Sequence, residues 1–219
     1  LFSMANQKLT LFTKWTSSCS WRVRCALHYK QIKYETQPVN LLDLNNENGR
    51  KLLKLNPASR VPMLIHGERV LTESMAIMEY LEENFDGPRL LPADSYARAQ
   101  SRAIALHIAC GIQPLQNMRV TRKVSQQHGP EASKEWAKYW THLGLKELEG
   151  MVSKTAGTYA VGDAVSIADT CIPSIMMKGR SWKVDVAEFP TLLRIDKNLA
   201  ALESFQAAHP DRQPEAAKQ

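Results

Sequence analysis

Residues 8–39 read KLTLFTKWTSSCSWRVRCALHYKQIKYETQPV, and their pattern decides the fold of the first part of the chain. Residues 8–14 alternate weakly between apolar and polar side chains, which predicts a strand. Residues 18–29 repeat apolar side chains at helical spacing, with serines before them that can cap a helix. Residues 32–39 alternate again. The stretch therefore predicts a strand, a helix and a second strand, which together make a βαβ unit.

The next 45 or so residues extend this unit. Residues 45–55 predict a short polar helix, and residues 61–66 and 69–72 predict a hairpin joined through a glycine. Residues 74–84 predict a helix with one apolar and one acidic face. The order βαβ, α, ββα is typical of an α/β thioredoxin-like domain, in which helices cover a small sheet.

A second domain follows a break at Asp86-Gly87-Pro88 and Pro92, which predicts a linker. We expect a thioredoxin-like domain at residues 6–87 and an all-α helical domain at residues 93–212. The helices predicted in the second domain span residues 95–124, 131–154, 166–178 and 191–202. Pro114 is expected to kink the first of these, and the polar tail from Asp211 to Gln219 is expected to fray.

Composition and charge exclude several classes of protein. The chain has 219 residues and a net charge of +6, but the positive charge is spread over both halves without a basic stripe, which argues against nucleic-acid binding. No apolar run is long enough for a membrane span, and no secretory signal precedes the first strand. Leu1-Phe2-Ser3 before Met4 look like residues left by cloning. We expect a cytoplasmic protein.

The cysteines do not form a metal site by spacing. They lie at positions 19, 25, 110 and 171, with no CxxC pair, and the six histidines are scattered. Cys25, Cys110 and Cys171 have apolar neighbours and are expected to be small core residues. We expect no metal and no disulfide framework.

Residues 16–24, TSSCSWRVR, raise the main chemical question, because they lie where a helix begins. A helix N-terminus presents free N–H groups and about half a unit of positive charge, which stabilises a thiolate. An ordinary thiol has a pKa near ~8.5, and lowering it by about two units requires roughly 2.7 kcal/mol. Ser17, Ser18 and Cys19 are the candidates for this site. The alternative is a plain helix cap beside a cysteine.

The chain resembles the soluble glutathione transferases from about residue 8 to residue 212, and within them the zeta class, the maleylacetoacetate isomerases. The serine-serine-cysteine motif that opens on WRVR is its most class-specific feature. Each of the other motifs is weak alone, but they occur in order and at the expected spacing. The motifs are residues 17–24, Asn56-Pro57 with Val61-Pro62, Glu73-Ser74, residues 111–117 (GIQPLQN), Val161-Gly162-Asp163 and residues 166–169 (SIAD).

The resemblance implies that the motif at residues 17–22 holds the sulfur of glutathione. Ser17 would face the sulfur, with Ser18, Cys19, Trp21 and Arg22 around it, and which of the first three activates the thiol stays open. A redox protein with this fold has a second cysteine three residues after the first. That position is Arg22, so Cys19 is expected to modulate binding, with a mixed disulfide to glutathione as the alternative.

The rest of glutathione is assigned to other loops. The resemblance implies a cis peptide bond at Val61-Pro62, whose backbone would pair with the cysteinyl unit; a plain edge proline is the alternative. Ser74 is predicted to be the N-cap of the helix that follows, which would leave N–H groups free for the carboxylate of the γ-glutamyl unit, and Glu73 would receive its ammonium group. Glu73 can also be read as a simple acid at a helix start.

The second domain is expected to complete the site. Gln113 and Asn117 are four residues apart and would share a helix face. The resemblance implies that this face lies over the active site, with Gln113 near the sulfur. Asn117, Met118 and Arg119 would lie near glutathione or a partner subunit, and Asn48 near the glycine end.

The resemblance implies that Arg180 binds a substrate carboxylate, and its planar guanidinium suits a carboxylate because it can donate two parallel hydrogen bonds. The neighbouring Lys178 and Lys183 allow the alternative of a solvated basic helix end. Ser166 and Asp169 are spaced as a capping box, for which the resemblance implies a role in folding.

The resemblance implies a homodimeric, glutathione-dependent isomerase that converts maleylacetoacetate to fumarylacetoacetate in tyrosine and phenylalanine breakdown, with transferase activity as well. Its thiolate would add to the cis double bond of a small dicarboxylate, the single bond would rotate, and elimination would return glutathione. Three alternatives stay open: a transferase or dehalogenase on α-halo acids, a thiol oxidoreductase using Cys19, and a silent interaction domain.

Overall fold

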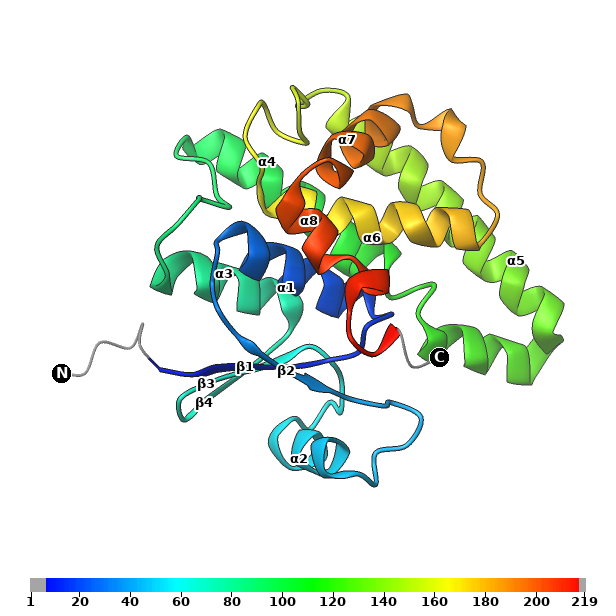
Figure 1. The fold of residues 1–219 in the computed structure, drawn as a ribbon. Helices are drawn as coiled ribbons and strands as arrows, with labels where there is room; N and C mark the ends of the chain where they lie inside the picture. Colours follow the sequence, from blue (N-terminus) through cyan, green and yellow to red (C-terminus); the bar gives the residue numbers. More distant parts are fainter. Residues whose placement is uncertain (1–6, 217–219) are drawn as a thin grey trace. The chain divides into compact units, whose positions relative to one another are not determined.

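A computed structural model describes residues 7–216 of the chain, which divide into two compact units. The first unit holds the described residues up to Leu90 together with those from Glu203 onward, and the second holds Leu91–Leu202 (Figure 1). Residue 6, the predicted domain start, and Leu1 to Met4 lie outside the described residues. The predicted helical domain extended to residue 212, whereas the last segment of the chain groups with the first unit.

The first unit is built on a four-stranded sheet in the order β2-β1-β3-β4. β1 (Leu9–Thr13) and β2 (Glu35–Pro38) are parallel, and β3 (Met63–His66) and β4 (Arg69–Thr72) form an antiparallel hairpin. The hairpin turns at Gly67, whose φ of 60° suits a residue without a side chain. The predicted βαβ unit and the hairpin are confirmed.

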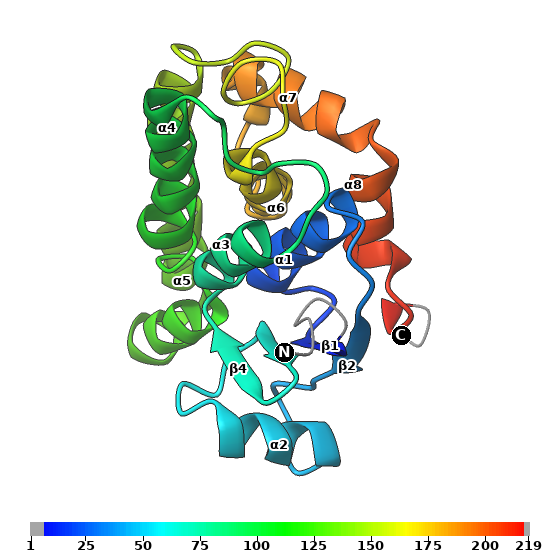
Figure 2. The same ribbon diagram turned by 90° about the vertical axis from the view of Figure 1, so that its left-hand side faces the viewer.

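Helices cover both faces of this sheet. α1 (Ser18–Tyr29) and α3 (Ser74–Asn84) lie together on one face, and α2 (Glu47–Leu55) lies on the other, as Figure 2 shows. Under α2 the sheet buries an apolar cluster, because the side chains of strand residues alternate between the two faces. The cluster consists of Phe12, Val39, Leu52, Val61 and Met63.

The end of the chain returns to the first unit. α8 (Glu203–Ala208) packs beside α1 and is followed by a short 3₁₀ turn at Pro210–Arg212. Gln213 is buried, and its side-chain amide donates to the carbonyl oxygens of Ala207 and His209 at 3.0 and 2.9 Å. The prediction of a fraying tail is therefore wrong for residues 211–213.

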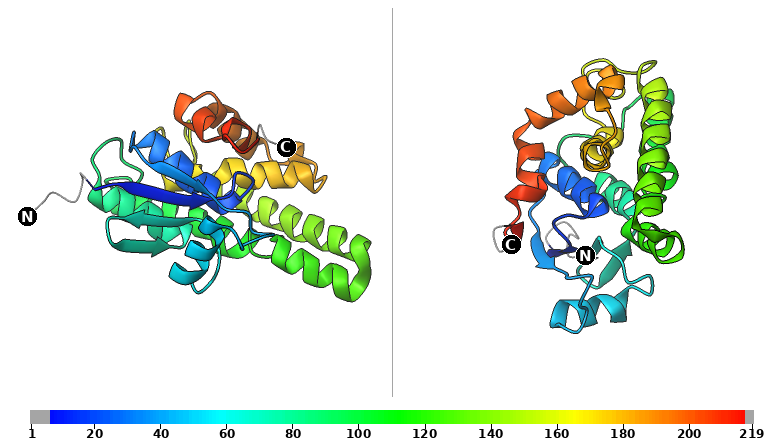
Figure 3. Two further views of the ribbon diagram at one scale, coloured as in Figure 1. Left: turned by 60° about the horizontal axis from the view of Figure 1, so that its bottom comes forward. Right: turned by 90° about the vertical axis from the view of Figure 1, so that its right-hand side faces the viewer.

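The second unit is all helical, as predicted. It contains α4 (Ser95–Leu106), α5 (Met118–Val152), α6 (Ile167–Ser181) and α7 (Pro190–Ala200). α6 packs against the other three, and its residues 167–176 are all buried because apolar and small side chains occupy every face (Figure 3).

The predicted single helix over residues 95–124 is wrong. α4 ends at Leu106 and continues as one π-helical stretch, His107–Ile112, after which the chain turns and α5 begins at Met118. Pro114 falls in the turn because it has no N–H to give to a helix interior. α5 itself breaks at Gly129 (φ 87°), just before Pro130, so its second part begins close to the start predicted for the next helix.

The capping box at α6 is present as predicted. The N–H and the hydroxyl of Ser166 each donate to Oδ2 of Asp169 at 2.8 Å, and the N–H of Ala160 donates to Oδ1 at 2.9 Å. Asp169 is fully buried, and this burial raises the pKa of Asp169 to about 6 although its donors act in the opposite direction. The carboxyl group thus ties the loop before α6 to the start of that helix.

Among the described residues, no helix combines the length and the apolar composition that crossing a membrane requires.

Asp169 makes the stability of the fold depend on pH with a defined sign. Its pKa of about 6 in the folded chain exceeds the ~3.9 of an unfolded aspartate. The stabilisation that this group gives is therefore complete below pH ~4 and is lost as the pH rises through 6. Urea unfolding of wild type and Asp169→Asn between pH 4 and 8 should show their stability difference shrinking as the pH rises. A difference that stays constant across this range would contradict the assignment.

Candidate functional site

The start of α1 is organised by Ser17. Ser17 is the N-cap, with φ −75° and ψ 121°, and its Oγ accepts a hydrogen bond from the N–H of Ser20 at 3.2 Å. A hydroxyl that accepts here still has its own hydrogen to donate. Ser17 can therefore be both a helix cap and a donor to a thiolate. Its hydroxyl oxygen stabilises the helix, and its hydroxyl hydrogen is free to stabilise an anion.

The next two residues share this helix start. Ser18 is buried, whereas Cys19 is half-buried and has a free thiol. The first turn of α1 carries no acidic residue, so the positive end of the helix dipole is not neutralised there. All three predicted candidates lie together, and the first turn favours a negative charge.

Trp21, a predicted glutathione contact, belongs to the core of the first unit. Its side chain is 5% exposed, and its ring lies edge-on to that of His209, with centroids 5.0 Å apart. Trp21 thus packs α1 against the segment that follows α8.

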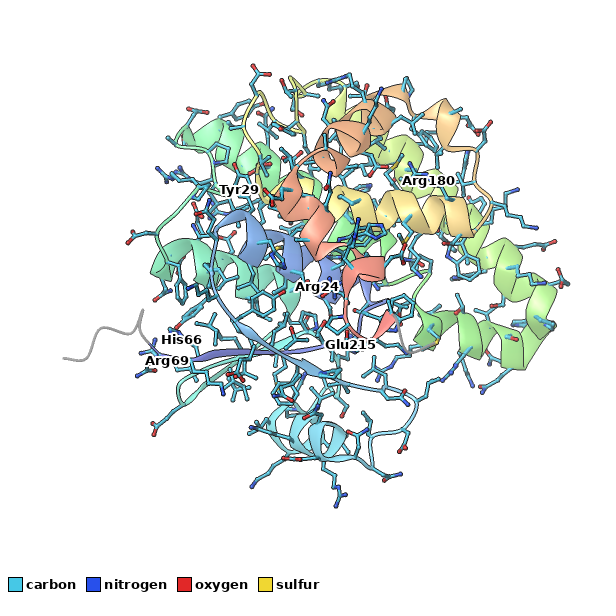
Figure 4. All side chains as sticks on the ribbon, viewed as in Figure 1. Arg24, Tyr29, His66, Arg69, Arg180 and Glu215 are labelled. Atoms are coloured by element: carbon cyan, nitrogen blue, oxygen red, sulfur yellow. The ribbon has the colours of Figure 1, made fainter. Side chains whose placement is uncertain are left out.

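Two buried arginines of the WRVR motif have very different surroundings. Each guanidinium nitrogen of Arg24 has an acceptor: its Nε donates to the carbonyl oxygen of Ala208, Nη1 to Oγ1 of Thr13 and Nη2 to the carbonyl oxygen of Trp15, at 3.0 to 3.2 Å. Figure 4 labels this side chain where α1 meets α8. Burial lowers the pKa of Arg24.

Arg22 lies two residues earlier and is buried as deeply. Its Nη1 donates to Oγ of Ser74 at 3.4 Å, while its Nε and Nη2 have no hydrogen-bond partner. Ser74 is the first residue of α3. Arg22 therefore connects the two helices that the sequence assigns to glutathione.

The prediction that Ser74 is the N-cap of α3 is wrong, because Ser74 is the first helical residue and the N-cap is Glu73, whose side chain makes no capping hydrogen bond. Ser74 is buried, and the exposed Glu73 before it has a φ of 65°, which is uncommon outside glycine. The first N–H groups of α3 are thus left for a partner that the helix itself does not supply. An anion is the chemical group that suits them.

The Val61-Pro62 bond is cis, as the resemblance implies. Both residues are buried immediately before β3, in the same unit as Ser17 and Ser74. Asn48 on α2 is half-buried, and its side-chain amide donates to the carbonyl oxygen of Pro38 at 2.9 Å. That contact uses one of the two N–H donors of the Asn48 amide, so its second N–H and its oxygen can still meet a ligand.

The predicted residues of the second unit lie on and beside a turn. Gln113 is half-buried in the turn after the π-helical stretch, while Asn117 is exposed and its Oδ1 accepts from the N–H of Arg119 at 3.0 Å as the N-cap of α5. Met118 and Arg119 begin α5 and are exposed. The argument that Gln113 and Asn117 share a helix face is wrong, because this segment is not helical.

Arg180 lies at the C-terminal end of α6 and already has an anionic partner. Its side chain is 48% exposed, and its Nη2 lies 2.7 Å from Oδ2 of Asp196 on α7 (Figure 4). A substrate carboxylate at Arg180 would have to share the guanidinium with Asp196.

Comparison with known proteins decides the family. A model of the glutathione S-transferase N-terminal domain matches residues 7–83. The probable maleylacetoacetate isomerase of Caenorhabditis elegans is 43% identical over 97% of this chain and 98% of its own length. This chain belongs to the maleylacetoacetate isomerase family of zeta-class glutathione transferases.

Two solved structures of zeta-class relatives agree with this fold. That of maleylacetoacetate isomerase from Anaeromyxobacter dehalogenans 2CP-1, with glutathione bound in its active site, has a TM-score of 0.87 and 40% identity, over 96% of this chain and 98% of that one. The enzyme from Methylobacterium extorquens AM1, with malonate and glutathione bound, has a TM-score of 0.87 and 37% identity, over 94% and 98%.

Independently of these relatives, the side chains of this zeta-class chain are chemically suited to glutathione. The capping hydroxyl of Ser17 can donate to a thiolate, the start of α3 is uncapped, and Arg22 has donors without partners. The tripeptide carries both a thiol and carboxylates, so its charges are of the sign that these groups favour. No group of three or more metal-ligating side chains occurs within residues 7–216.

Lys178, which the alternative interpretation of the sequence placed at a solvated helix end, is instead half-buried. Lys178 on α6 is half-buried, burial lowers the pKa of Lys178, and it has no ion pair within the described part of the chain. It shares a helix face with Trp182, four residues on, whose Nε1 donates to Oε1 of the buried Gln116 at 3.1 Å. In the sequence, the four-residue spacing between Lys178 and Trp182 was the signal that could have predicted a half-buried lysine.

Arg24 should be essential to the zeta-class fold of the first unit. Arg24→Met removes three hydrogen bonds and leaves buried acceptors on β1, the following loop and α8 without donors. We expect a loss of roughly 2–5 kcal/mol in the free energy of unfolding, because each buried orphan acceptor is costly. Urea denaturation followed by tryptophan fluorescence measures this, and a loss below about 1 kcal/mol, the scale of one ordinary hydrogen bond, would contradict the role.

Proposed function

We propose that this chain is a glutathione-dependent cis–trans isomerase that converts maleylacetoacetate to fumarylacetoacetate in tyrosine and phenylalanine breakdown. The observation that carries the proposal is the start of α1, where the Ser17 hydroxyl caps the helix and keeps a hydrogen to donate. Relatives that match this chain over nearly their whole length are named maleylacetoacetate isomerases, which supports the assignment.

The residues of α1 act by holding a thiolate. The Ser17 hydroxyl donates to the sulfur, and the unneutralised helix start adds positive potential, so the anionic form is favoured near neutral pH. Ser18 and Cys19 are included in this site as proposed neighbours of the sulfur. When bound, glutathione supplies the nucleophile that makes the double bond of the substrate temporarily single.

The remaining contacts of glutathione are proposed from its shape and charge. The start of α3 at Ser74 takes the carboxylate of the γ-glutamyl unit, and Glu73 takes its ammonium group. The backbone at Val61-Pro62 meets the cysteinyl unit, and Asn48 meets the glycine end. Gln113, Asn117, Met118 and Arg119 are proposed as further contacts from the second unit or a partner subunit.

The proposal includes a homodimer and a cytoplasmic location. Both rest on the resemblance, and the first is checked by light scattering of the purified protein. A monomer at micromolar concentration would remove the partner-subunit role from Arg119 and leave the chemistry at Ser17 untouched.

Ser17→Ala should lower the rate of maleylacetone isomerisation by about 10²–10³-fold, because it removes one donor to a developing charge. The assay follows the cis and trans isomers optically with and without glutathione, and measures glutathione before and after. Isomerisation should require glutathione without consuming it.

Cys19→Ala is the matched control, since it removes the thiol at the same helix start and leaves the Ser17 hydroxyl in place. It should retain isomerisation. Loss of activity in Cys19→Ala with retention in Ser17→Ala would move the proposal to a thiol oxidoreductase. Absence of isomerisation in wild type despite glutathione binding would move it to a transferase or dehalogenase on α-halo acids.

A diacid substrate also needs a cation for its carboxylate, and α6 offers two. Arg180 is the predicted one, although Asp196 competes for it, and Lys178 is two residues earlier on a different face of the helix. Arg180→Met should raise the KM for the diacid maleylacetoacetate about tenfold or more, as expected for a lost charge-assisted hydrogen bond. Asp196→Asn should lower the KM because it frees the guanidinium.

Lys178→Met decides between the two cations. A KM that rises in Lys178→Met and is unchanged in Arg180→Met would contradict the role of Arg180 and assign the substrate carboxylate to Lys178. The comparison uses kcat as well as KM, since loss of uniform binding raises KM alone.

A further inference from the structure

The two arginines of WRVR differ in a way that burial alone does not explain. Arg22 is 1% exposed and Arg24 is 0% exposed, and both lie on α1. Every nitrogen of Arg24 has an acceptor, whereas Nε and Nη2 of Arg22 have none. Within residues 7–216, Arg22 also has no ion-pair partner. Arg22 is thus a buried cation that the described chain leaves uncompensated.

An uncompensated buried guanidinium is unfavourable in the protein alone. Taking a charge out of water is costly unless hydrogen bonds or an opposite charge replace the lost hydration. Buried polar groups without partners are few in folded proteins, and each calls for a specific reason. A bound anion close to Arg22 would supply one.

The single contact of Arg22 indicates where that anion binds. Nη1 donates to Oγ of Ser74 at 3.4 Å, and an arginine can only donate, so Ser74 is the acceptor. The hydroxyl hydrogen of Ser74 is therefore still available to donate to another group. Ser74 begins α3, an 11-residue helix without a side-chain cap, so free N–H groups are at the same place.

We propose that Arg22 is a positioning residue that acts through Ser74: it orients the Ser74 hydroxyl and supplies the counter-charge for the α-carboxylate of the γ-glutamyl unit of glutathione. The contact of Arg22 in this region is with the Ser74 hydroxyl, so its effect on the carboxylate is exerted through that hydroxyl and through its charge. This inference rests on the proposed function, in which the start of α3 takes that end of glutathione.

The test compares two ligands that differ by this one carboxylate. Glutathione and γ-aminobutyryl-cysteinylglycine, which lacks the α-carboxylate, are titrated calorimetrically into wild type, Arg22→Met and Ser74→Ala. Arg22→Met should raise the Kd of glutathione at least tenfold and change the Kd of the analogue less than twofold. Ser74→Ala should give the same pattern, and the double variant should lose little more than either single one.

The melting temperature of the ligand-free protein separates positioning from simple structure. Replacing an uncompensated buried charge with an apolar side chain of similar length should leave this temperature unchanged or raise it. Arg24→Met is the matched control, two residues away and equally buried, and it should lower the melting temperature. Arg22→Lys keeps the charge and should restore part of the affinity for glutathione.

Equal losses of affinity for both ligands in Arg22→Met, or a fall in its melting temperature like that of Arg24→Met, would overturn the inference. Failure of the proposed function gives a different result, because wild type itself would then not bind glutathione or not isomerise maleylacetone.

Discussion

One buried guanidinium connects the parts of the first unit that are farthest apart in the sequence. Arg24 donates to Thr13 at the end of β1, to Trp15 in the loop that follows, and to Ala208 at the end of α8. The sheet, the first helix and the last helix of the chain are thereby linked through a single side chain. The loop between β1 and α1 is fixed at its root, and Ser17 is presented from that loop. The chemistry proposed at Ser17 thus depends on a contact with the other end of the chain.

The helix start that caps α1 is also the place of the proposed chemistry. An N-cap needs an oxygen to accept from the helix, and a thiolate site needs a hydrogen to donate, and one hydroxyl has both. Ser17 meets the first need through the N–H of Ser20. Since the folding role fixes the position of the oxygen, the direction left for the hydrogen is also restricted. This coupling provides a preorganised donor without a separate structural element.

Local periodicity predicted much of this molecule. The period of two in residues 8–14 and the helical spacing in residues 18–29 placed β1 and α1 within a residue or so, because one face of each is buried. α8 was missed as a separate element, since six residues are too few to show a period. The π-helical stretch before residue 113 was also missed, as its hydrogen-bond pattern has no distinct sequence signal. Pro114 signalled an interruption but not its form.

Site residues were predictable by type but not by environment. The motif placed two arginines on α1, and nothing in the letters RVR distinguishes the satisfied Arg24 from the uncompensated Arg22. That distinction depends on which elements arrive from elsewhere: α8 and β1 at one residue, and α3 at the other. Arg180 was selected for its planar guanidinium, and its pairing with Asp196 depends on how α7 packs against α6. Long-range partners of this kind come from tertiary structure, which local pattern does not encode.

The helices of the first unit also differ in whether their first turn carries an acidic residue. In the first unit α2 and α8 each have a glutamate in the first turn, Glu47 and Glu203, which neutralises the positive end of the helix. α1 and α3 have none, and these are the two helices whose starts carry Ser17 and Ser74. A glutamate in either first turn would stabilise the empty protein and oppose a thiolate or a carboxylate at that place. Both first turns lack an acidic residue, although the N-cap of α3 is Glu73, and Arg22 of α1 donates to Ser74 of α3. The positive potential of the first turns thus stays available to an anionic ligand.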